Sequence, residues 1–62
     1  MTTTAARERE VATWASKARD ATMRRDRAIH RARADGMSLR HIADAAGLTH
    51  PAVAKILARP AP

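Results

Sequence analysis

The chain has 62 residues, enough for one small domain, and sixteen of them are alanine, which leaves only twelve larger apolar side chains. It has no cysteine, which excludes a disulfide-stapled fold, and no apolar run of the about 20 residues that a membrane-spanning helix needs. Twelve Lys and Arg against six Asp and Glu leave a net charge of +6, which favours an anionic partner such as nucleic acid, although solubility alone also explains it.

Residues 4–35 predict one long helix, because this range contains neither Gly nor Pro and is rich in Ala, Arg and Glu. Thr4 is the expected N-cap, and residues 1–3 are expected to be disordered. The run Arg24–Arg27 interrupts an apolar face of this helix, so two helices with a kink near Asp20 are the alternative. That face is formed by Val11, Trp14, Ala15, Ala18, Ala21, Thr22, Ile29 and Ala32, at spacings of three and four.

Two glycines mark helix ends. Gly36 suits the left-handed position just past the long helix, where Met37 follows it, and Gly47 suits the same position after a short helix over about residues 39–46. Ser38 is the expected N-cap of that short helix, because its side-chain oxygen accepts a hydrogen bond from a free amide.

Thr49 is the expected N-cap of a third helix over residues 50–58. Pro51 is tolerated in its first turn, where the missing N–H has no intrahelical partner. Pro60 ends this helix, and residues 59–62 are expected to fray. Since no segment alternates as a strand does, the predicted fold class is all-α, a long helix followed by two short ones.

The two short helices have the apolar pattern of a helix-turn-helix over residues 38–58. Ala43 is small where the helices approach, and Leu48 fills the turn. Ile29 and Ala32 of the long helix are expected to complete a three-helix core. The side chains expected to face inward from the short helices are Ile42, Ala46, Val53, Ile56 and Leu57.

The stretch SLRHIADAAGLTHPAVAKIL, residues 38–57, resembles the helix-turn-helix of bacterial DNA-binding regulators. Residues 25–58 are similar to small regulators common in high-G+C bacteria and their phages and plasmids. The positions that match are Ile42, Ala43, Gly47, Leu48, Val53 and Ile56. The resemblance implies a recognition helix over residues 50–58 in the major groove of double-stranded DNA. It also implies that Arg40 contacts the backbone.

Base contacts and phosphate contacts are expected from different positions of this motif. The resemblance places His50, Pro51 and Lys55 at base-reading positions, although proline cannot donate to a base edge. The residues expected at base edges are Thr49, His50, Pro51, Ala52 and Lys55. The residues expected at phosphates are Ser38 with the amides that follow it, Arg40, His41 and Arg59. The run Arg24–Arg27 is either a further DNA contact or a solvated face.

Val11, Trp14 and Ala18 have no expected partner within one chain, so we expect them to form a homodimer interface. The two helix-turn-helix units of the dimer would then bind a palindromic site. The predicted function is sequence-specific DNA binding in transcriptional regulation. The alternative is a helical dimerisation or adaptor protein in which the helix-turn-helix is only a scaffold.

No chemistry beyond binding is expected. His30, His41 and His50 lack the paired spacing of a metal site, so we expect them to be solvated or to face phosphates, with no metal and no cofactor. Ser38 and Thr49 are explained as caps, and no acid–base pair is evident, so no enzyme is predicted. The first residues lack the apolar segment of a secretory signal, which favours a cytoplasmic, nucleoid-associated protein.

Overall fold

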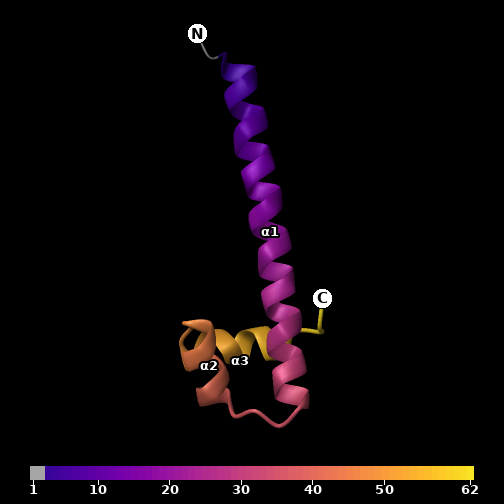
Figure 1. Cartoon of the computed structure of the whole chain (residues 1–62), viewed down its shortest axis with the longest axis vertical. Helices are drawn as coiled ribbons and strands as arrows, with labels where there is room; N and C mark the ends of the chain where they lie inside the picture. The colour runs from indigo at the N-terminus through magenta and orange to yellow at the C-terminus, as the bar shows by residue number, and fades with distance from the viewer. Residues whose placement is uncertain (1–2) are drawn as a thin grey trace.

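The computed structural model describes residues 3–62, which form three helices and no strand. Helix α1 spans Thr4–Ala34, α2 spans Leu39–Ala46 and α3 spans His50–Ala58. Figure 1 shows α2 and α3 gathered beside the C-terminal end of α1, with α3 running across it. We call the unit formed by α2, α3 and the last turns of α1 the head. The all-α fold is therefore confirmed for the described residues.

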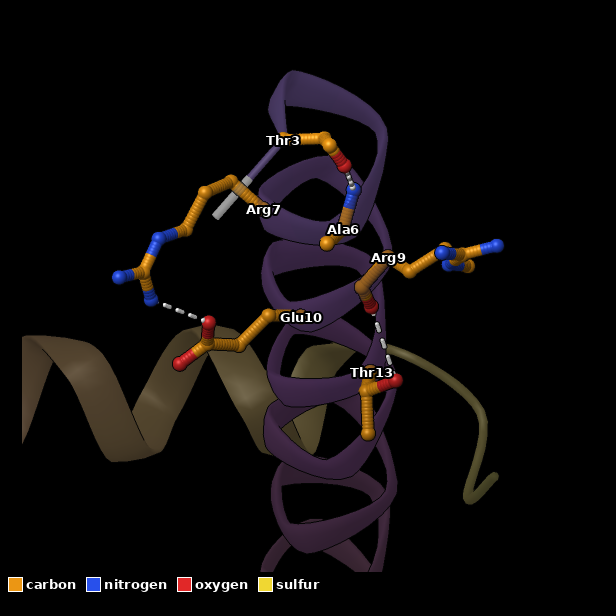
Figure 2. A network of polar contacts seen from close by, with 6 residues as sticks. All are labelled: Thr3, Ala6, Arg7, Arg9, Glu10 and Thr13. Carbon is orange, nitrogen blue, oxygen red and sulfur yellow. Dashed lines mark hydrogen bonds and ion pairs between the residues drawn. The ribbon is translucent and has the colours of Figure 1, made fainter. Parts of the chain in front are cut away.

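Helix α1 is one continuous helix of 31 residues, so the alternative of a kink near Asp20 is wrong. Its N-cap is Thr3, not Thr4 as expected. The Thr3 Oγ1 accepts a hydrogen bond from the amide of Ala6 at 3.1 Å (Figure 2). Thr3 therefore does not belong to a disordered N-terminus, whereas residues 1–2 of that prediction lie outside the described part of the chain.

Both glycines end helices as predicted. Gly36 has φ +95° and Gly47 has φ +67°, values that side chains with a Cβ rarely adopt. Beyond each glycine the chain bonds back to the helix: Met37 N–H donates to the Ala32 carbonyl and Leu48 N–H to the Ala43 carbonyl, each at 3.0 Å. Each bond runs from the residue after the glycine to a carbonyl five residues earlier, as in a Schellman motif.

The core lies where the three helices meet. The residues partly buried around it are Ala32, Met37, Ala46, Leu48 and Leu57. Its buried members are Ile29, Ile42, Ala43, Val53 and Ile56. Seven of these ten side chains were predicted to face inward or to complete the core. Of the other three, Ala43 was expected where the short helices approach, Leu48 in the turn, and Met37 directly after the helix-ending glycine. The three-helix core is confirmed.

Helix α1 projects far beyond the head (Figure 1). The Cα radius of gyration is 15.8 Å, whereas about 10.6 Å is typical of a compact chain of this length. No other element lies beside the N-terminal part of α1. Val11 and Trp14 are therefore 68% and 62% exposed.

Two hydrogen bonds tie the C-terminal end of the chain to α1, and both differ from expectation. His30 is half-buried, and its Nε2 lies 3.1 Å from the Ile56 carbonyl oxygen, so this ring nitrogen is engaged within the chain rather than with solvent or a phosphate. Arg27 Nε donates to the Pro62 carbonyl at 2.9 Å. Residues 59–62 were expected to fray, but their last residue is held against α1.

Candidate nucleic-acid interface

The first turn of α3 is built as a capped, pre-set helix start. Thr49 is the N-cap, and its Oγ1 accepts a hydrogen bond from the Ala52 amide at 3.2 Å. The Thr49 carbonyl accepts the first backbone bond, from Val53 N–H at 3.1 Å. Pro51 occupies the first turn and has no N–H that needs a partner. The expected cap and proline placement are confirmed.

Helix α3 has one buried face and one exposed face. Val53 is 0% exposed and Ile56 is 6% exposed, which fixes the rotation of the helix about its axis. Pro51 and Lys55 are four residues apart, so they lie together on the opposite, exposed face. His50 is also exposed, at the N-terminal end.

Ala52 differs from the other predicted base-contact residues. It is half-buried, because its position on α3 lies at the border of the face that carries Val53 and Ile56. Thr49 is exposed, but its hydroxyl oxygen already accepts the Ala52 amide. The free side chains brought together on α3 are therefore those of His50, Pro51 and Lys55.

The start of α2 offers a second group of donors. Ser38 is the N-cap, and its Oγ accepts a hydrogen bond from the His41 amide at 3.1 Å. Within the described chain the amides of Leu39 and Arg40 have no acceptor, as is usual for the first turn of a helix. The side chains of Arg40 and His41 are exposed and make no hydrogen bond with described residues. An anion at this helix start would meet two free amides and a cation.

Arg59 lies directly after α3 and is exposed. Its amide donates to the Ile56 carbonyl at 3.3 Å. Its guanidinium makes no hydrogen bond or ion pair with the described chain. It is the last of the predicted phosphate-contact residues, and it lies at the end of α3 far from Thr49.

The arginine run of α1 is only partly available. Arg25 bonds the neighbouring Asp26 Oδ1 through Nε at 3.1 Å and Nη2 at 3.0 Å. Arg27 is bonded to the Pro62 carbonyl. Arg24 is exposed and makes no such bond. Of the three arginines that the sequence offered as further DNA contacts, two are therefore engaged within the chain.

The predicted dimer residues lie on the projecting part of α1. Val11, Trp14 and Ala18 are all exposed in the single chain. The Lys17 ammonium lies 4.5 Å from the centre of the Trp14 ring, within range of a cation–π interaction. Figure 2 shows the ion pair between Arg7 and Glu10, 2.7 Å apart, near the N-terminal end of this helix.

The described residues contain neither a metal-ligand cluster nor a membrane-spanning helix. No three His, Asp or Glu side chains of residues 3–62 lie close enough together to hold a metal ion. None of the three helices is long and apolar enough to cross a membrane.

Comparison with known proteins gives no relative: no family model, no curated protein and no solved structure matches this chain.

Proposed function

We propose that the protein is a sequence-specific DNA-binding transcriptional regulator whose recognition helix is α3. One observation carries the proposal. Burial of Val53 and Ile56 leaves the capped N-terminal turn of α3 with Pro51 and Lys55 on its exposed face. A recognition helix needs this arrangement, since its N-terminal residues meet base edges in the major groove.

The polar contacts divide into two roles. Lys55 and His50 donate to base acceptors, such as guanine O6 and N7 for the lysine, and Pro51 contacts a thymine methyl. The start of α2 binds a phosphate through the free amides of Leu39 and Arg40, and through the Arg40 side chain. His41 and Arg59 extend the backbone contacts on either side.

One head offers few contacts, so the proposal includes a second. The side chains of Val11 and Trp14 are exposed on the projecting part of α1, and a homodimer would cover them. A symmetric dimer then places two heads on a palindromic site in the nucleoid, where the second head adds its own DNA contacts to those of the first.

The test is a salt titration of binding on two duplexes: an inverted repeat from the DNA beside the gene, and a scrambled version of it. A regulator keeps at least about a 10³-fold preference for the specific duplex at physiological salt. Binding to both duplexes falls as salt rises, because each neutralised phosphate releases counterions. The decisive quantity is the difference between the two curves.

The competing proposal is a helical adaptor, favoured by the exposed Val11 and Trp14. A basic adaptor also binds DNA at low salt, but without choosing a sequence. Curves that coincide on every duplex taken from the neighbourhood of the gene would refute the regulator and favour the adaptor.

A further inference from the structure

An apolar groove lies between α1 and α2, away from the exposed face of α3. It has a volume of about 290 Å³, enough for one large side chain. Arg25 lies at one end of it, and Ala45 of α2 lines the opposite wall. Its other lining residues are Ala28, Ile29, Ala32, Met37, Ile42 and Ala46. The groove is open in the single chain.

The groove and the exposed Trp14 lie on the same face of α1. Eleven residues separate Trp14 from Arg25 and eighteen separate it from Ala32, which are about three and five complete turns of an α-helix. One continuous stripe therefore runs along α1, with a large projecting side chain near one end and a groove near the other. Between them it carries the small side chains of Ala18 and Ala21, which allow two helix backbones to approach closely.

We propose that two copies of this chain pair through α1 in antiparallel orientation, with Trp14 of each copy packed in the groove of the other. The two-fold axis then passes beside residues 20–21, midway between Trp14 and the groove. Both ends of the helix pair make the same contact, as a two-fold interface requires. The inference deepens the proposed homodimer and is independent of DNA binding.

Charge favours this orientation over the parallel one. Residues 4–18 carry three Lys and Arg against two Glu, a net charge of +1, whereas residues 19–34 carry six Arg against two Asp, a net charge of +4. A parallel pair places the two strongly basic halves side by side. An antiparallel pair places each basic half beside the weakly charged half, which contains Glu8 and Glu10, and so reduces the repulsion.

Arg25, which lines the groove, carries a group that can stack on an indole ring. The Arg25 guanidinium is held by two bonds to Asp26, at 3.0 and 3.1 Å, and the Arg25 side chain as a whole is 42% exposed. Planar guanidinium groups stack on indole rings, where the charge is attracted by the ring face. Trp14 already has one cation, Lys17, over its ring in its own chain. Arg25 of the other copy would supply a second.

The exposed area is large enough for a dimer. The chain exposes 4978 Å², whereas about 3,900 Å² is expected of a folded monomer of 6.7 kDa. The excess of about 1,000 Å² exceeds the about 800 Å² that each partner buries in a stable interface. The projecting α1 accounts for this excess (Figure 1).

The arrangement also sets the distance between the heads. Each head contacts α1 around residues 29–30, so the separation of the two heads along the helix pair is about 27 Å at 1.5 Å per residue. Half-sites on DNA are separated by one helical turn, about 34–36 Å. Under the proposed function, the separation along the helix pair is therefore of the same order as this half-site spacing and somewhat shorter than it.

The orientation is tested by measuring distances between spin labels in the full chain without DNA, at two exposed positions. The chain has no cysteine, so Arg9→Cys and Ser16→Cys each carry a single label per copy. In the antiparallel dimer the axial separation is about 35 Å at residue 9 and about 14 Å at residue 16. The measured distance must therefore shorten markedly from the first position to the second. Equal distances at both positions indicate a parallel pair and overturn the inference.

The groove contact is tested by Ala45→Arg, with Ala54→Arg as the matched control. Both alanines are exposed, but only Ala45 lines the groove, so only its arginine obstructs the partner's Trp14. We expect Ala45→Arg to weaken dimerisation about tenfold or more, and to move the emission of the sole tryptophan to longer wavelength. Ala54→Arg should leave both unchanged, and circular dichroism checks that both variants are folded.

Two results would overturn the groove contact: dimerisation equally strong in Ala45→Arg and wild type, or a wild-type chain that stays monomeric at millimolar concentration. Since no DNA is present, these outcomes are distinct from failure of the proposed function. An antiparallel dimer that ignores DNA sequence supports this inference and refutes the regulator.

Discussion

Replacing Arg40 with alanine removes one exposed cation from each head of the proposed dimer. Arg40 lies in the first turn of α2, beside two amides without acceptors, and its side chain makes no hydrogen bond or ion pair with described residues. Alanine has the highest helix propensity, so the variant keeps α2 and the core beneath it. Any change in DNA binding then reports the lost cation alone.

The expected magnitude follows from counterion release. Each neutralised phosphate contributes about −0.9 to the slope of log affinity against log salt, so losing one contact in each head makes the slope shallower by about 1.8. Between 50 and 200 mM salt, the fall in affinity of the variant is then about 12-fold smaller than that of the wild type. The loss should be equal on specific and scrambled duplexes, because a phosphate contact carries no sequence information.

Fluorescence anisotropy on a labelled duplex at five or six salt concentrations measures the slope. Arg19→Ala is the control, since Arg19 is exposed on α1 about 15 Å along the helix from Ile29 of the core. It removes the same charge and should leave the slope unchanged. Equal slopes for Arg40→Ala and wild type, or an equal reduction in both variants, would refute the phosphate contact at the start of α2.

Three further predictions follow from other parts of the chain. Lys55→Ala should cost about 1–3 kcal/mol of specific binding and relax the preference at one base position, as measured by competition with single-base variants of the site; an equal loss on random DNA contradicts base reading. Trp14→Ala should lower the dimer fraction in sedimentation at micromolar protein, because truncating a buried aromatic costs about 3–5 kcal/mol; a fully dimeric variant places the interface elsewhere. Gly47→Ala should lower the free energy of unfolding by about 1 kcal/mol, because φ is +67° although a Cβ there meets no atom within 4 Å. Thermal unfolding should show a drop of about 4–8 °C, with a smaller drop for Gly47→Asn, and equal drops contradict the backbone cause.

The sequence alone determined the helices of the head and their ends. Ser38 and Thr49 cap through amides three residues away, and the residue after each of Gly36 and Gly47 donates to a carbonyl five residues earlier. Such interactions depend on neighbours within one or two turns, so residue type and spacing predict them.

The same locality explains the one-residue error at the start of α1. Three consecutive threonines can each cap a helix, and local preference does not choose among them.

The core was also predictable, because a helix repeats every 3.6 residues and apolar side chains at that spacing share a face. Ile42 and Ala43 on α2, and Val53 and Ile56 on α3, were expected inward and are buried. The exposed positions of α3 were predictable for the same reason, since a helix that buries one face exposes the residues of the opposite face. Ala52 lies at the border between the two faces, where periodicity alone does not decide burial.

Only the tertiary structure decided which polar groups are already engaged and where the groove lies. His30 meets a carbonyl 26 residues away and Arg27 meets one 35 residues away, so no local pattern shows either contact. The groove needs walls from both α1 and α2, and it exists because the turn at Gly36 brings α2 back against α1. Its alignment with Trp14 depends on α1 being one unbroken helix, since a kink near Asp20 would have rotated the two halves of the stripe apart.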